Sequence, residues 1–127
     1  MSSRFDPNEG LIIVRTQLWG PSGDTIVRLA LDTGATRSVV SWEVALLLGY
    51  DPTIVTDRRQ MATASGVEFA PVIEVERIRA LGALRRNFPV LCHNLPSSIE
   101  LDGLLGLSFF PGRRLVVNFR EGALSLA

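Results

Sequence analysis

One carboxylate stands at the end of an apolar run and leads into a tight turn. Residues 29–31 are apolar and run straight into Asp32, Thr33 and Gly34, and two valines follow at positions 39–40. Burying a carboxylate between apolar segments is costly unless it is hydrogen-bonded, paired or used. Gly34 lets backbone amides approach it, and the Thr33 hydroxyl can bond to a neighbouring loop. These residue types suit acid–base chemistry, although the same tripeptide is also typical of a β-turn.

The sequence argues against other catalytic centres. Cys92 is the only cysteine and His93 the only histidine, so no internal disulfide can form. Metal centres built on several cysteines or histidines are excluded as well, and we expect no metal site. A nucleophile paired with a base is disfavoured because adjacent residues of a strand point to opposite faces. We interpret the pair as a buried thiol beside a surface imidazole.

Length and charge narrow the class of protein. A chain of 127 residues is expected to form one domain. The formal net charge is zero, so nothing favours binding to nucleic acid or to an anionic membrane surface. The N-terminus has no apolar leader, and no apolar run approaches membrane-spanning length. We therefore expect a cytoplasmic protein with no nucleic-acid or membrane partner.

Short β-type segments make up most of the chain and must position Asp32. A helix is expected over residues 41–49, with Ser41 as its N-cap and Gly49 at its end. Strands are expected over residues 11–19, 25–31, 38–40, 58–64, 67–70, 71–79, 84–92, 114–119 and 123–127. Residues 25–31 form the second arm of a hairpin and deliver Asp32. Many short strands at close turn spacing predict an all-β barrel or sandwich.

The order of the motifs is more specific than any one of them. A hairpin enters the Asp-Thr-Gly turn, a small-residue hairpin follows over residues 62–67, and residues 104–106 read Leu-Leu-Gly. This order resembles the retropepsin-like aspartic proteases, particularly the compact single-domain bacterial forms. The resemblance covers residues 11–127 and leaves residues 1–10 as an N-terminal extension. It implies a mostly β acid-protease barrel with one or two short helices and one half-site per chain.

The resemblance also implies roles for individual residues. Asp32 maps to the catalytic carboxylate. The active-site loop continues through Thr33, Gly34, Ala35 and Thr36. Leu104, Leu105 and Gly106 map to the strand that supports this loop, where the glycine lets the loop pack against bare backbone. Ala62, Thr63, Ala64, Ser65, Gly66 and Val67 map to a mobile flap that closes over substrate, although an ordinary surface hairpin would look the same.

Three positions depart from the family pattern. Retroviral members often carry an Asp and an Arg that form an ion pair where this chain has Thr36 and Leu107. Both charged partners are absent together, so no charge is left unpaired. Ser108 stands where bacterial relatives often carry Asp or Asn, which leaves the support of the loop by this segment open.

Aspartic proteolysis requires two carboxylates that share one proton, one acting as base and the other as acid. This chain has one Asp-Thr-Gly motif. Asp102 precedes a glycine but lacks the intervening Thr or Ser, and Asp24 precedes a threonine but lacks the glycine. The simplest solution is a C₂ homodimer with Asp32 and its symmetry mate at the axis, acting on a peptide or protein substrate. Such a site requires no metal or organic cofactor.

Two other functions remain open from the sequence. The first is a non-catalytic dimerisation or peptide-binding module with the same fold, whose function should survive Asp32→Asn. The second is a generic β-barrel that binds a ligand, which would leave the glycine at position 106 unexplained.

Overall fold

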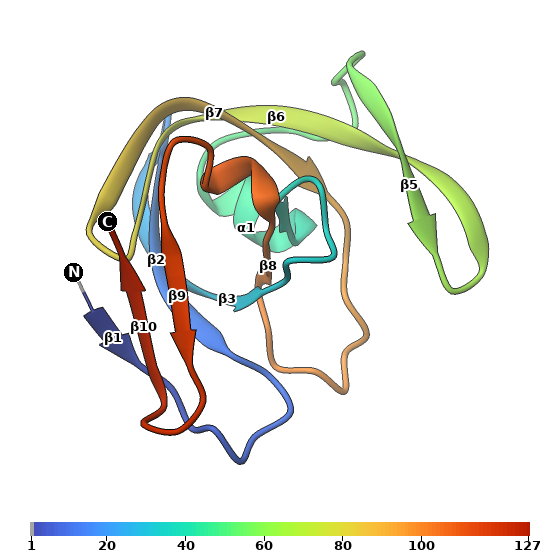
Figure 1. Ribbon diagram of the computed structural model, residues 1–127. Coiled ribbons are helices and arrows are strands. Elements are labelled where there is room, and N and C mark those ends of the chain that lie inside the picture. The colour runs from blue at the N-terminus through green and yellow to red at the C-terminus, as the bar shows by residue number, and fades with distance from the viewer. Residues whose placement is uncertain (1) are drawn as a thin grey trace.

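Six strands close on themselves to form a barrel in the computed structural model, which describes residues 2–127 (Figure 1). The order around the barrel is β2-β3-β8-β4-β7-β6, and a pairing between β2 and β6 closes it. The strands are β1 (Ser2–Arg4), β2 (Ile13–Gly20), β3 (Gly23–Leu31), β4 (Val39–Val40), β5 (Arg58–Thr63), β6 (Gly66–Ala80), β7 (Ala83–Cys92), β8 (Gly103–Leu105), β9 (Leu115–Asn118) and β10 (Ala123–Leu126). The expected all-β fold class is confirmed.

Alternation along the strands fills the barrel interior. Val14, Thr16 and Leu18 on β2 and Val27 and Leu29 on β3 are buried, while Arg15, Gln17 and Arg28 between them are more exposed. Helix α1 (Trp42–Leu47) packs Val44 into the same core. The Ser41 hydroxyl accepts a hydrogen bond from the Val44 amide at 3.2 Å, so the expected N-cap is confirmed. No helix in residues 2–127 is long and apolar enough to cross a membrane.

Two parallel pairings place the end of β3 inside the structure. Strand β3 runs parallel to β8, with Leu31 opposite Leu105, and β4 runs parallel to β7. A single turn of 3₁₀ helix, η1 (Leu107–Phe109), follows β8. Consequently the chain leaves β3 at Asp32 directly beside the end of β8, although about 70 residues separate them in sequence.

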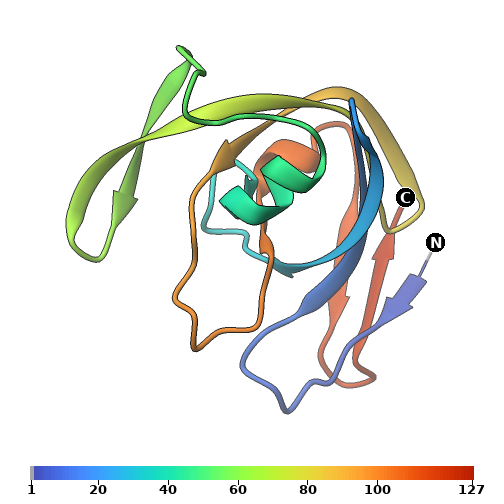
Figure 2. The ribbon, with the colours of Figure 1, turned by 180° about the vertical axis from the view of Figure 1, so that it is seen from behind.

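Strand β6 is longer than expected and carries a hairpin away from the barrel. The sequence predicted a break near Pro71, but β6 runs unbroken over 15 residues. Its partner changes there: β6 pairs with β5 up to Pro71 and with β7 from Val72 onward. A residue without an N–H is tolerated at such a change of partner. Strand β5 pairs with β6 alone, and the hairpin extends away from the barrel in both ribbon views (Figures 1 and 2).

A small second sheet joins the two ends of the chain. Its order is β1-β10-β9, and all its pairings are antiparallel. Strand β1 belongs to the segment that the sequence assigned to an N-terminal extension. The amide of Phe5 continues the pairing by donating to the carbonyl of Gly122 at 2.8 Å. The N- and C-terminal ends therefore lie side by side, as both ribbon views show.

Candidate active site

The carboxylate of Asp32 is held in place by the turn that follows it. The Gly34 amide donates a hydrogen bond to Oδ1 of Asp32 at 2.9 Å. The Asp32 amide donates to the Leu105 carbonyl at 3.0 Å, and the Ala35 amide donates to the Asp32 carbonyl at 3.2 Å. The side chain is half-buried. One carboxylate oxygen is thus oriented by backbone, and no group in residues 2–127 donates a hydrogen bond to the other.

Two glycines let β8 and its end pack against the segment that follows Asp32. A Cβ on Gly106 would overlap the Arg37 carbonyl oxygen and lie 2.8 Å from the carbonyl oxygen of Ala35. A Cβ on Gly103 would overlap the carbonyl oxygen of Val39. These distances are shorter than any side chain tolerates, so both glycines are required by close backbone approach.

Two buried or half-buried serines connect the loop to η1. The Ser38 hydroxyl, 1% exposed, accepts from the Gly106 amide at 3.0 Å and lies 3.2 Å from the Ser108 hydroxyl. The Ser108 hydroxyl accepts from the Ser38 amide at 3.2 Å. Ser108 therefore supports the loop. Ser38 was not singled out from the sequence, where its signal is a hydroxyl at the start of an apolar strand.

Backbone hydrogen bonds join the Asp32 loop to η1 at Thr36 and Leu107, the two positions where the resemblance would place an ion pair. The Leu107 amide donates to the Ala35 carbonyl at 2.8 Å, and the Ser108 amide donates to the Thr36 carbonyl at 3.0 Å. The loop and η1 are therefore connected through their backbones, although neither position carries a charged side chain.

A cleft of about 590 Å³ opens beside Asp32. Six residues singled out in the sequence line it: Asp32, Gly34, Ala35, Thr36, Ala62 and Leu104. Five lining residues were not foreseen: Arg37, Val39, Gln60, Met61 and Leu91. The others, namely Thr33, Leu105, Gly106 and residues 63–67, do not line it. The cleft thus brings together the Asp32 loop, β4, β7, β8 and residues 60–62 of β5.

The small-residue hairpin folds as a tight turn at the tip of β5 and β6. Thr63 pairs with Gly66 across the turn, and the Thr63 hydroxyl donates to the Gly66 carbonyl at 3.1 Å. Val67 is 58% exposed and Phe69 is 65% exposed. Ala62 faces the Asp32 cleft, whereas Val67 lines a separate hollow of about 370 Å³ beside His93.

Other ionisable groups do not complete an acid–base pair with Asp32 inside one chain. Asp102 lies outside the cleft, where its Oδ2 accepts from the Arg28 amide at 2.8 Å. Burial raises the pKa of the Cys92 thiol to about 11, which keeps it protonated and unreactive. His93 is engaged at 3.7 Å with Glu68. Within residues 2–127, no group of three or more His, Cys, Asp or Glu residues is placed to hold a metal ion.

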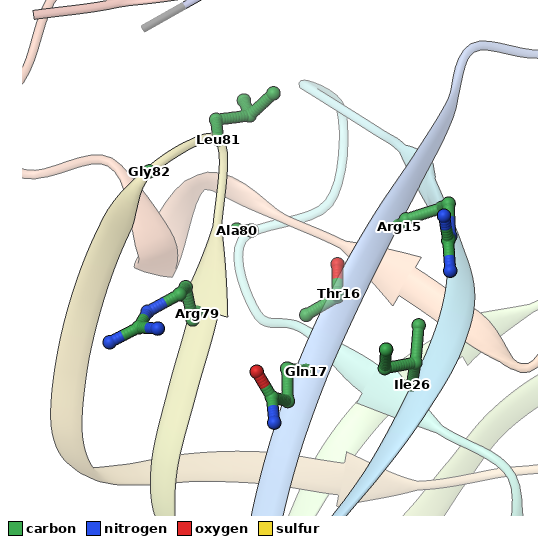
Figure 3. A pocket seen from close by; sticks show the side chains of 8 residues that line it. All are labelled: Arg15, Thr16, Gln17, Ile26, Arg79, Ala80, Leu81 and Gly82. Atoms are coloured by element: carbon green, nitrogen blue, oxygen red, sulfur yellow. The ribbon is translucent and has the colours of Figure 1, made fainter.

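A further hollow, of about 300 Å³, lies against β2, β3 and β6, and Asp32 is not among its lining residues (Figure 3). Arg15 and Gln17 on β2 and Arg79 on β6 line it, together with Ile26 on β3. None of its lining residues is a carboxylate, a cysteine or a histidine. Of these two hollows, only the Asp32 cleft offers a carboxylate for acid–base chemistry.

Comparisons with known proteins agree with this geometry. A family model described as aspartyl protease matches residues 22–109, a range that contains the Asp32 loop, the β5–β6 hairpin and Gly106. The structure is similar to the crystal structure of a retropepsin-like aspartic protease from Rickettsia conorii, with a TM-score of 0.68 and 22% sequence identity. That match covers 100% of this chain and 98% of the other, and at this identity it shows a shared fold. No curated protein matches the chain.

Proposed function

The chain belongs to the aspartyl protease family, with a retropepsin-like fold, and from this premise we propose that it is a homodimeric endopeptidase for extended peptides. The observation that carries the proposal is the placement of Asp32. Its carboxylate is oriented by the Gly34 amide and faces a cleft large enough for peptide side chains. A carboxylate held only for structure would have no reason to line such a cleft.

The chemistry requires a second carboxylate, and a symmetry mate supplies it. Two Asp32 side chains at a two-fold axis would share one proton, because like charges so close together cannot both ionise. The ionised member takes a proton from water as that water attacks the scissile carbonyl carbon. The protonated member donates its proton to the carbonyl oxygen. Asp32 thus serves as both acid and base in a symmetric pair.

Two features support association of two copies at this loop. The cleft of one chain contains a single carboxylate, so one copy is incomplete. The exposed Thr33 hydroxyl has no hydrogen-bond partner within residues 2–127. It is therefore free to bond to the loop of the second copy.

The β5–β6 hairpin offers a means of holding an extended peptide. Strand β5 pairs with β6 on one side only, and Gln60, Met61 and Ala62 of β5 line the cleft. An edge strand beside a cleft can pair with peptide backbone as an added strand. The hairpin would then act as the flap over the bound substrate.

The decisive experiment compares Asp32→Asn with Asp24→Asn on a diverse peptide library at several pH values. Both variants neutralise one aspartate that precedes a threonine, but Asp24 lies near the start of β3, where it accepts a hydrogen bond from the Gln17 side chain. We expect Asp32→Asn to lose about 10²–10⁴-fold or more in rate. Asp24→Asn should retain activity.

Folding and assembly are measured alongside, by thermal unfolding and sedimentation. Undiminished proteolysis by Asp32→Asn would overturn the proposal. If the wild type binds peptides without cleaving them, and Asp32→Asn binds them equally well, the chain is instead a peptide-binding module. Specific activity should also fall on dilution through the dimer dissociation range, and an active monomer in sedimentation would exclude the shared site.

A further inference from the structure

Arg37 is a free cation at the Asp32 cleft. It lines the cleft and is exposed. Within residues 2–127 its guanidinium makes no ion pair and no hydrogen bond. Other arginines are engaged: Arg59 lies 3.2 Å from Asp57, and Arg85 donates to the Phe109 carbonyl at 2.6 Å. Arg37 therefore has unused hydrogen-bond donors beside the proposed reaction centre.

The rest of the cleft provides no other unpaired charge. Its walls include the apolar side chains of Val39, Met61, Leu91 and Leu104. The only other charged lining residue is Asp32, which the proposed chemistry engages in a shared-proton pair. A bound peptide thus meets these four apolar side chains, the polar side chains of Thr36 and Gln60, and one cation.

The base of Arg37 is fixed even though its side chain is free. Its carbonyl oxygen packs against Gly106, and the next residue, Ser38, is buried and hydrogen-bonded to the Gly106 amide. The guanidinium is therefore displayed from a rigid support, which is the arrangement that favours selective binding.

We propose that Arg37 selects peptides that carry an Asp or Glu side chain near the cleaved bond, next to an apolar residue that fills the cleft. This inference rests on the proposed function and names its substrate class. A guanidinium binds a carboxylate through two parallel N–H···O hydrogen bonds, and the matching amide cannot replace that geometry or charge. In a two-fold dimer each chain presents one Arg37, so the preference applies on both sides of the cleaved bond.

The test uses matched peptides that differ only by Glu, Gln or Lys, placed in turn at each position flanking the cleaved bond. We expect the wild type to favour Glu over Gln by about fivefold in kcat/KM at its best position, and less at high salt. Arg37→Gln should bring this ratio close to one, and Arg37→Glu should reverse it in favour of Lys. An unchanged ratio in Arg37→Glu would overturn the inference.

Arg86→Glu is the matched control for net charge. Arg86 is exposed on β7, lies outside the cleft and makes no ion pair within residues 2–127. Arg86→Glu should leave the Glu-to-Gln ratio in kcat/KM as in the wild type. An equal shift in this control would mean that the effect of changing Arg37 comes from net charge alone. Sedimentation supplies a second check. If Arg37→Gln weakened the dimer without changing the Glu-to-Gln ratio, the role of Arg37 would be in dimer assembly and not in peptide selection.

Binding separates this inference from the proposed function. The same Glu and Gln peptides, labelled with a fluorophore, are titrated into Asp32→Asn with and without Arg37→Gln. A preference for Glu that needs Arg37 supports the inference even if no variant cleaves peptide. Equal affinity for Glu and Gln peptides would overturn it even if the wild type is a protease.

Discussion

The support beneath Asp32 and the β5–β6 hairpin are built in opposite ways. The support consists of β3, the loop that follows it, β8 and η1. Buried hydrogen bonds join these segments, and Gly103 and Gly106 allow their backbones to make close contact. In the hairpin, β5 pairs with β6 alone, and the side chains of Val67 and Phe69 are exposed. One region can hold a reacting group in a fixed position, and the other can move to admit and cover a peptide. Positioning of the reacting group and access of the peptide therefore depend on different regions of the chain.

The largest contrast between the two regions should appear in amide hydrogen exchange. Free energies of local opening range from near zero in loosely packed segments to the full unfolding free energy in the core. Amides of residues 62–67 should therefore exchange at least about a thousandfold faster than the amides of Asp32 and Gly106. Binding of a peptide-like transition-state mimic should slow the hairpin amides.

The reason is that bound peptide offers hydrogen-bond partners to the hairpin backbone and lowers its freedom. The comparison is made on the same sample, with and without the mimic, at one pH. Slow exchange in residues 62–67 of the free protein, unchanged by the mimic, would remove the assignment of this hairpin as a flap. The role proposed for Asp32 would be unaffected, because it rests on other residues.

Adding a side chain to Gly106 should have the next largest effect. Gly106→Val forces atoms into the carbonyl oxygens of Arg37 and Ala35, and overpacking of this kind typically costs about 1–3 kcal/mol. The free energy of unfolding and the peptidase activity should therefore fall together. Denaturant unfolding measures the first.

Gly10→Val is the control, because nothing lies within 4 Å of a Cβ at that position. It should unfold like the wild type. If Gly106→Val unfolded like the wild type, the backbone around position 106 would have to shift easily. The support beneath Asp32 would then not be rigid, and it would not differ from the hairpin in this respect.

The sequence predicted the parts of the site that depend on local chemistry. Asp32 and its glycine turn, the Ser41 cap and the late Gly106 were all recognisable from residue type and order. The Asp32 turn and the Ser41 cap act through neighbouring backbone, which the local sequence specifies, whereas Gly106 was recognised from the order of the motifs and contacts a loop that is distant in sequence. Their arrangement around one cleft needed the structure.

What the sequence missed depends on pairing between distant strands. Leu91 reaches the cleft only because β7 runs parallel to β4, and no local pattern fixes that register. Strand β1 forms only because its partner β10 lies at the other end of the chain. Pro71 suggested a break in a strand that is in fact continuous, because the proline falls where β6 exchanges one partner for another.

Removing one hydroxyl from each region should also cause different losses of stability. Ser38→Ala leaves the buried amide of Gly106 without its acceptor, which costs about 1–3 kcal/mol. Ser65→Ala removes an exposed hydroxyl from the hairpin turn and should change stability by less than about 0.5 kcal/mol. Equal losses in denaturant unfolding would mean that the Ser38 network adds nothing beyond an ordinary surface contact.

The smallest expected effect concerns a link between the hairpin and the barrel. Glu68 of β6 lies 3.7 Å from His93, whose amide donates to the Val40 carbonyl of the barrel at 3.0 Å. The two side chains form an ion pair only when His93 is protonated. Arg58 lines the same hollow. The Glu68–His93 contact therefore links the hairpin to the barrel through one partly exposed pair of side chains.

Glu68→Gln should accordingly loosen the hairpin slightly. Both side chains are partly exposed, so water screens the pair and the effect on hairpin opening should not exceed about fivefold. Exchange of the hairpin amides is measured in the variant and the wild type in the same buffer. A ratio of the two rates close to one would show that the hairpin is held by its strand pairing alone, which would sharpen the contrast with the support beneath Asp32.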